Sequence, residues 1–275
     1  QQSQAEWTTN EGKVFGTTYH ITYHSAHDMH DSILVALAQV DSSLSMFNPE
    51  SQVAKINSNE TDVMNPQLKH LLAQSLEISQ KTDGAFDVTV APLVNAWGFG
   101  FKQGSFPDSM MVDSLLQLTG YEKVSMNEQG EVVKQDERMM LNCSAIAKGY
   151  AVDVIANLLK SKGVKNMMVD IGEIFCDGLN PSGLPWMLGI DRPVDGNNDP
   201  GMQLQGIFRS PEGPHGIVTS GNYRKFYVRD GRKYAHTIDP RTGMPVQHQL
   251  LSATIVAENA LLADAYATYA RHSDV

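Results

Sequence analysis

Residues 225–238 read KFYVRDGRKYAHTI. Two runs of β-prone residues, 225–228 and 233–238, flank the pair Asp230-Gly231. An Asp-Gly pair between two such runs is the strongest short-range signal for a β-hairpin. The stretch therefore predicts two antiparallel strands joined by a two-residue turn.

Other strands are expected earlier in the chain. Segment 18–23 alternates larger apolar and polar residues, which is the period of a half-buried strand. Segments 167–171 and 186–190 are short apolar runs bounded by Gly and Pro, which is typical of strands.

Helices are expected in separate blocks, marked by apolar residues at helical spacing and by capping signals. Strands joined by hairpins with helices in separate blocks indicate an α+β fold. The expected helices are one through Ile33, Leu34, Leu37, Val40 and Leu44; one from Asn65 and Pro66 to Asp83 and Gly84, with Leu68, Leu71, Leu72, Leu76 and Ile78 in the core; one from 142–144 to Gly163; and one at 257–270.

Composition narrows the class of protein. The 275 residues contain no repeat, Pro-rich linker or low-complexity tract, so a single domain over 1–275 is expected. The net charge of -10, without a basic run, argues against a nucleic-acid partner. No stretch reaches the roughly 20 apolar residues that span a bilayer. The two cysteines, Cys143 and Cys176, give no disulfide framework and are expected to be buried apolar residues.

Asp264 and Thr268 are four residues apart in the last expected helix, so both oxygens lie on one helical face. A carboxylate beside a hydroxyl suits a hard cation such as Mg²⁺. A hydrogen bond on the helix surface explains the same spacing, and on the pair alone it is the more common case.

Two further segments have the residue types of a nucleotide site. Segment 145–150 places small residues and Lys148 at a helix start, where backbone N–H groups favour anions; a packed helix with a surface lysine is the alternative. Segment 82–87 places a turn before Phe86 and Asp87, which suits stacking on a flavin or adenine ring. A helix end followed by a strand at 88–90 is the alternative there.

His236 stands at the end of the second hairpin strand, and 219–223 forms a polar stretch before the hairpin. A histidine with an ordinary pKa near ~6.5 can accept a hydroxyl proton at neutral pH. With nine histidines in the chain, only its neighbours distinguish this one. The polar stretch is compatible with an ordinary turn.

These segments, taken in order, resemble the flavin transferase family known as ApbE. The resemblance covers nearly the whole chain, and no single motif carries it. The stretches that resemble the family are 15–19, 44–47 with Ser51 and Asn57, 82–87, 91–100, 145–153, 219–223, 236–243 with Pro245, and 263–268.

The resemblance implies a two-lobed, T-fold-like α+β architecture with antiparallel sheets and packed helices. It also implies a site for FAD and Mg²⁺ with His236 as the residue that assists proton transfer. Mg²⁺ would be held by Asp264, Thr268 and the backbone oxygen of Ala145. The FAD site would be lined by Phe15, Phe47, Ala85, Phe86, Asp87, Asn142, Lys148 and Ile238.

The implied reaction is Mg²⁺-dependent transfer of FMN from FAD to a Thr or Ser of an acceptor flavoprotein subunit, with release of AMP. The implied location is the periplasmic or extracytoplasmic face of a bacterial membrane, with membrane contact only through a lipid anchor outside this chain. Two alternatives stay open, an FAD pyrophosphatase on the same fold and a flavin-binding protein without turnover.

The sequence departs from the family pattern at three places. Asn142 stands where many members carry Asp, and 170–173 holds one glycine where two in a row are usual. The chain stops at Val275, soon after the metal helix, so a shortened C-terminus is expected.

Overall fold

The computed structural model describes residues 4–98, 105–194, 196–197, 199–221, 226–229, 231–247 and 250–272. The chain divides into two compact units. Unit 1 comprises 1–41, 145–221 and 252–267, and unit 2 comprises 42–144, 222–251 and 268–275. Several residues of the predicted motifs lie outside the described residues: Phe99, Gly100, Asn222, Tyr223, Lys225 and Asp230.

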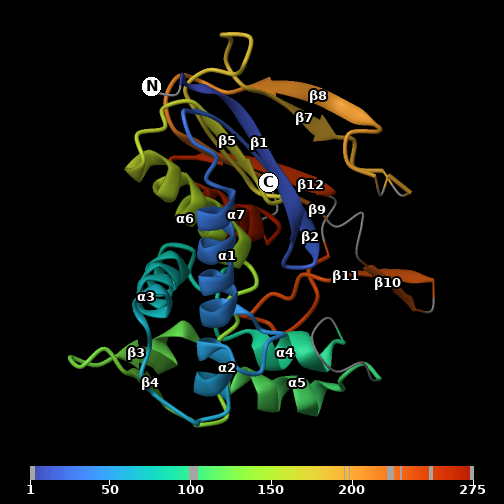
Figure 1. Cartoon of the computed structure of the whole chain (residues 1–275). Helices are drawn as coiled ribbons and strands as arrows, with labels where there is room; N and C mark the ends of the chain where they lie inside the picture. The colour runs from blue at the N-terminus through green and yellow to red at the C-terminus, as the bar shows by residue number, and fades with distance from the viewer. Residues whose placement is uncertain are drawn as a thin grey trace. The chain divides into compact units, whose positions relative to one another are not determined.

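Unit 1 is built on a six-stranded antiparallel sheet, which confirms the α+β prediction (Figure 1). The strand order is β1-β2-β5-β6-β9-β12. The strands are β1 (Glu6–Val14), β2 (Thr17–Ser25), β5 (Met167–Asp170), β6 (Ile174–Asp177), β9 (His215–Gly221) and β12 (Ser252–Ala257). Strand β9 includes residues 219–221, so the polar stretch there is a strand end paired with β12 instead of a turn.

Different elements cover the two faces of this sheet. Helix α6 (Ala147–Ser161) contacts β5 and β6, and α7 (Ala260–Ala270) packs on β9 and β12 through Ala263 and Ala267 (Figure 1). A separate two-stranded ribbon of β7 (Met187–Asp191) and β8 (Leu204–Arg209) packs Leu188 and Phe208 against Cys176 and Ile217. Residues 173, 175 and 177 of the β6 hairpin therefore face the helices, because alternate strand residues point to opposite faces.

The turn between β1 and β2 consists of Phe15 and Gly16, both with positive φ, 50° and 72°. Two such residues form the two-residue turn that matches the twist of a hairpin. Phe15 adopts this conformation although bulky residues rarely do. In β2, Tyr19, Ile21 and Tyr23 are buried, as the alternation predicted.

The helices follow the sequence signals, with corrections at their ends. Helix α1 (His30–Leu44) buries Ile33, Leu37, Val40 and Leu44, but Leu34 is 45% exposed because the apolar stripe is narrower than predicted. Helix α3 (Pro66–Lys81) is capped by Asn65, as predicted.

Two helix starts were predicted too early. Helix α6 begins at Ala147 and not at 142–144, because the Asn142 side chain accepts the Ser144 N–H at 2.9 Å and holds a turn there. Helix α7 begins at Ala260 and not at 257, because 252–257 pairs with β9 and the Asn259 side chain caps the helix through the Leu262 N–H.

Unit 2 contains the remaining helices and two small hairpins. One core cluster gathers Leu93, Trp97, Val112 and Ile238, and Trp97 Nε1 donates to the Gly243 carbonyl at 2.8 Å. The hairpin predicted at 225–238 is confirmed as β10 and β11, but the second strand ends at Ala235 and not at Ile238. The elements of unit 2 are α2 (Gln52–Asn57), α3, α4 (Ala91–Ala96), α5 (Ser109–Leu116), η1 (Tyr121–Lys123), β3 (Val124–Met126), β4 (Val132–Lys134), β10 (Phe226–Arg229) and β11 (Arg232–Ala235).

Three smaller expectations can be compared with the structure. Residues 88–90 form a turn and not a strand. Cys143 and Cys176 are both buried and form no disulfide, as predicted. Within the described segments, no helix combines the length and apolar character needed to cross a bilayer.

Candidate active site

The first turn of α6 carries an ion pair between a half-buried lysine and a buried glutamate. Lys148 Nζ lies 2.9 Å from Glu173 Oε1, and Glu173 is 7% exposed. Burial alone lowers the pKa of Lys148, but the charge and hydrogen bond of Glu173, followed by the charges of Asp264 and Asp170, outweigh it and raise that pKa. Lys148 is therefore a fixed cation at the end of α6 where backbone N–H groups favour anions.

Asp264 on α7 contacts the first turn of α6. Its Oδ2 accepts the backbone N–H of Gly149 at 3.0 Å. A Cβ on Gly149 would lie 2.4 Å from the Ala260 carbonyl oxygen and 2.8 Å from Asp264 Cβ. Gly149 is thus the residue that allows α6 and α7 to approach so closely.

Asp153, one turn further along α6, caps α7. Its two carboxylate oxygens accept the N–H groups of Ala260 and Leu261, both at 2.8 Å. Burial raises the pKa of Asp153 to about 6, against the lowering effect of these two hydrogen bonds. The start of the helix that bears Asp264 is therefore fixed to α6.

The turn between β5 and β6 adds negative charge beside Lys148. The Asp170 carboxylate accepts the Gly172 N–H at 2.8 Å, and burial raises the pKa of Asp170. Gly172 has φ +91°, and a Cβ there would lie 3.6 Å from Lys148 Nζ. The charges of Glu173, Asp264 and Asp170 thus all stabilise the Lys148 ammonium group.

The predicted metal ligands fit a cation that prefers oxygen. Helix α7 places Asp264 and Thr268 one turn apart, and Ala145 lies in the turn directly before α6. In the described part of the chain, no three His, Cys, Asp or Glu side chains gather as a metal site. A metal held with Asp264 would then need hydroxyl or backbone oxygens, which are ligands that Mg²⁺ accepts.

In unit 2, His236 follows β11 and contacts Arg271. The Arg271 Nη1 atom lies 2.9 Å from His236 Nε2. Because a guanidinium has donors only, Nε2 accepts this hydrogen bond, and the proton of a neutral ring is then on Nδ1.

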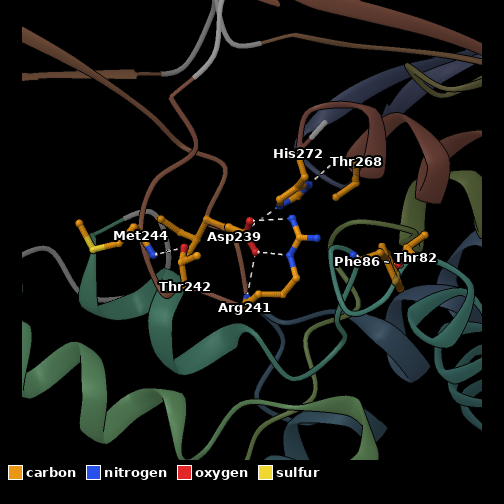
Figure 2. Close-up of polar contacts among 9 residues, drawn as sticks. Thr82, Phe86, Asp239, Arg241, Thr242, Met244, Thr268 and His272 are labelled. Atoms are coloured by element: carbon orange, nitrogen blue, oxygen red, sulfur yellow. Dashed lines mark hydrogen bonds and ion pairs between the residues drawn. The ribbon is translucent and has the colours of Figure 1, made fainter. Parts of the chain in front are cut away.

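His272 joins the end of α7 to the segment after His236. Its Nδ1 lies 2.7 Å from the Thr268 carbonyl oxygen and its Nε2 lies 3.1 Å from the Ile238 carbonyl oxygen. Figure 2 shows His272 beside Thr268. Burial lowers the pKa of His272. A neutral ring has one N–H and donates to one of the two carbonyls, so His272 lies between the backbone at Thr268 and at Ile238 with a hydrogen bond to one of them.

A bidentate ion pair follows Ile238. Arg241 Nε and Nη2 donate to the two oxygens of Asp239 at 2.9 and 2.8 Å (Figure 2). Burial works against ionisation of Asp239, but the hydrogen bonds and charge of Arg241 prevail and lower its pKa. The pair holds the loop that ends in Gly243, whose φ is +71°.

The 82–87 turn is packed and internally bonded. Ala85 and Phe86 are 1% and 2% exposed, and the Phe86 N–H donates to Thr82 Oγ1 at 3.2 Å (Figure 2). The Phe86 ring is therefore not displayed at the surface. The Asp87 carboxylate accepts hydrogen bonds from the Thr89 N–H, the Thr89 hydroxyl and the Tyr121 N–H.

The remaining predicted FAD residues lie in separate places. Phe15 is in the β1–β2 turn, Phe47 is 81% exposed, and Ile238 is in the core of unit 2. Asn142 donates its backbone N–H to the Val88 carbonyl at 2.6 Å. The structure therefore brings together one group in each unit. In unit 1 these are Lys148 and Asp264 at the start of α6, directly after Ala145. In unit 2 these are Ile238 and Thr268, which both contact His272.

Sequence reasoning assigned no role to Asp153 or Glu173. Asp153 lies among buried residues of α6, and an ionisable residue within an apolar stripe is the signal that identifies it. Glu173 carried no comparable signal, because its neighbour Lys148 is distant in sequence.

Comparisons with known proteins identify the family of this chain. The ApbE family model matches residues 15–272. The FAD:protein FMN transferase of Vibrio cholerae serotype O1 is 34% identical over 97% of this chain and 81% of the relative, and that of Escherichia coli K12 is 33% identical over 96% and 77%.

Solved structures give the same result. The flavin transferase ApbE from Vibrio cholerae matches with a TM-score of 0.84 and 32% identity, over 96% of this chain and 86% of that one. The apo form of the Pseudomonas stutzeri flavinyl transferase ApbE matches with a TM-score of 0.86 and 31% identity, over 98% and 85%. This chain belongs to the ApbE family.

Proposed function

We propose that this chain is a FAD:protein FMN transferase. The relatives that match over most of its length carry that name, and this similarity is the observation on which the proposal chiefly depends. In the proposed reaction a Thr or Ser hydroxyl of an acceptor protein attacks the phosphorus next to the riboflavin portion of FAD. The new P–O bond joins FMN to the acceptor. The bond from the same phosphorus to the bridging oxygen of the pyrophosphate breaks, and AMP leaves with that oxygen.

The proposed magnesium ligands are Asp264, Thr268 and the backbone oxygen of Ala145. When bound, Mg²⁺ would supply positive charge that stabilises the pyrophosphate as charge builds on it. Gly149 fixes Asp264 at the start of α6 through its N–H, and Asp153 fixes the first turn of α7. The ion pair with Glu173 already holds the Lys148 side chain in place. Lys148 therefore offers a positioned positive charge to the phosphates when they bind.

The proposed FAD contacts are those that the family resemblance implies. Lys148 is suited to phosphate by its charge. The hydrogen bonds of Asp87 hold the end of the 82–87 turn, so the backbone of Ala85 and Phe86 is positioned before ligand binds. The full proposed set is Phe15, Phe47, Ala85, Phe86, Asp87, Asn142, Lys148 and Ile238.

His236 is the proposed acceptor of the hydroxyl proton. A neutral imidazole takes a proton on the nitrogen that carries the lone pair, which here is Nε2. Because Arg271 donates to that atom, the proposal requires Arg271 to give way as the acceptor hydroxyl arrives. A base of this kind contributes roughly 10²–10⁴-fold to the rate.

We also propose that the two units act together as one ApbE-like domain, at the extracytoplasmic face of a bacterial membrane. Membrane-associated redox subunits with a Thr or Ser acceptor are the proposed partners, and a lipid anchor outside this chain is the proposed membrane contact. The family resemblance supports this location.

One assay tests the reaction. The full chain is mixed with FAD, Mg²⁺ and a candidate acceptor, and the intact acceptor is weighed by mass spectrometry. The expected result is a gain of one FMN residue with release of AMP, and no gain in an acceptor whose target Thr is replaced by Val. Free FMN and AMP with an unmodified acceptor would identify a pyrophosphatase, and intact FAD would indicate binding without turnover.

A further inference from the structure

The turn between β5 and β6 holds a carboxylate whose hydrogen bonding is incomplete. Glu173 Oε1 contacts Lys148 Nζ at 2.9 Å. The second oxygen, Oε2, is buried and has no hydrogen-bond partner among the described residues. The two oxygens of one carboxylate are covalently fixed side by side, so Oε2 lies in the same cluster as Lys148.

The hairpin turn itself does not need this carboxylate. The Ile171 N–H donates to the Glu173 backbone carbonyl at 3.0 Å, and the Gly172 N–H donates to Asp170. The turn backbone is thus held by Asp170 and by main-chain hydrogen bonding. A buried acceptor without a donor is destabilising, and more so when it is charged, so the position of Glu173 requires another explanation.

Lys148 and Glu173 together present a cation beside an acceptor at the first turn of α6. A ligand with a phosphate next to a hydroxyl or N–H group complements such a pair, because the phosphate faces Lys148 and the donor faces Oε2. FAD carries phosphates flanked by sugar hydroxyls, and it also carries ring N–H groups.

We propose that Glu173 is an FAD-binding residue, whose Oε2 accepts a hydrogen bond from an O–H or N–H group of the nucleotide while Oε1 orients Lys148. This inference rests on the proposed function. It assigns a direct ligand contact to a residue that the sequence motifs left without a role.

The test compares FAD binding by the full wild-type chain and by Glu173→Gln, with stopped-flow flavin fluorescence in Mg²⁺ buffer before turnover. Lys148 requires the amide oxygen of the glutamine, so the amide N–H₂ then faces the ligand donor. We expect FAD affinity to fall by at least about tenfold, the range of a hydrogen bond to a charged group. Glu173→Asp keeps the charge but shortens the side chain, and should lose affinity similarly if the glutamine variant does not fold.

A matched control lies on the same hairpin. Asp177 faces Lys160 of α6 at 3.9 Å, so Asp177→Asn neutralises a second α6–β6 pair and should bind FAD like wild type. Binding of FMN and of AMP identifies the ligand half that carries the donor, because only one of the two should weaken.

Two outcomes would overturn the inference. Wild-type affinity in the folded Glu173 variants would exclude the contact while leaving the proposed function intact. Equal weakening for FMN and AMP would show that Glu173 acts only through Lys148 and phosphate. Absence of FAD binding by the wild-type chain would contradict the proposed function itself.

Discussion

The backbone N–H of Gly149 donates a 3.0 Å hydrogen bond to the carboxylate of Asp264. This contact fixes the proposed metal ligand of α7 against the first turn of α6, where Lys148 stands. The two segments are 115 residues apart in the chain, so their contact depends on close packing of the two helices.

Gly149→Ala should disturb that packing. The added Cβ would meet the Ala260 carbonyl at 2.4 Å, and backbone cannot move aside as a flexible side chain does. We expect a loss of about 1–3 kcal/mol in the free energy of unfolding and slower FMN transfer, measured by urea denaturation and by the transfer assay. Gly206→Ala is the control, since a Cβ there meets nothing within 4 Å. Equal effects of both changes would contradict the packing argument.

Asp153 should make stability depend on pH. Its pKa is raised by burial from an ordinary 3.8 to about 6 in the folded protein. The folded state therefore binds a proton more tightly than the unfolded state, and the contribution of Asp153 to stability is present below about pH 4 and falls as pH rises to about 6.

The stability difference between wild type and Asp153→Asn isolates this effect. Between pH 4 and pH 6.5 we expect the free energy of unfolding of the wild type to fall by about 2–3 kcal/mol relative to that of Asp153→Asn. Above that range the difference should not change with pH. Urea denaturation at several pH values measures it. A difference that stays constant with pH would show that the Asp153 carboxylate titrates normally.

Asp87 should be a structural residue as well as a proposed FAD contact. Its carboxylate accepts two hydrogen bonds from Thr89 and a third from the Tyr121 N–H, which connects the turn to Tyr121. Asp87→Ala should lower the free energy of unfolding by about 2–4 kcal/mol, because buried N–H groups lose their acceptor. Unchanged stability with weaker FAD binding would mean that Asp87 serves the ligand alone.

His272→Ala should loosen the end of α7. The change removes the side chain between the Thr268 and Ile238 carbonyls, and we expect a loss of about 1–2 kcal/mol in stability together with slower transfer. Thermal unfolding and the transfer assay measure the two effects. His27→Ala, at an exposed site, should leave both unchanged. Full activity in a destabilised His272→Ala variant would remove the link to function.

The sequence predicted those elements whose signal is local. The Asn65 cap before Pro66, the alternation in β2 and the pairing of β10 with β11 each depend on a few neighbouring residues. Strands β1 and β8 were missed because both expose much of their surface and lack a clear apolar alternation. They are strands because neighbouring strands pair with them, which no short window of sequence records.

Some residues of the candidate site were predicted from local motifs, and others were recognised only from the structure. The motifs identified Lys148, His236 and Asp264 by residue type and order. The capping of α7 by Asp153 joins residues 107 and 108 positions apart, and the Lys148–Glu173 pair joins a helix to a hairpin turn. Such contacts follow from the packing of α6 on the sheet, so they became visible only in the structure.

The most direct test is the Mg²⁺ dependence of FMN transfer by wild type and by Asp264→Asn. Asparagine keeps an oxygen that can accept the Gly149 N–H, so the fold should persist while the negative charge is lost. We expect transfer that saturates with Mg²⁺ in the wild type and a rate reduced by at least about 10²-fold in the folded variant. Transfer by the variant at the wild-type rate, or by the wild type after removal of divalent metal, would contradict this expectation.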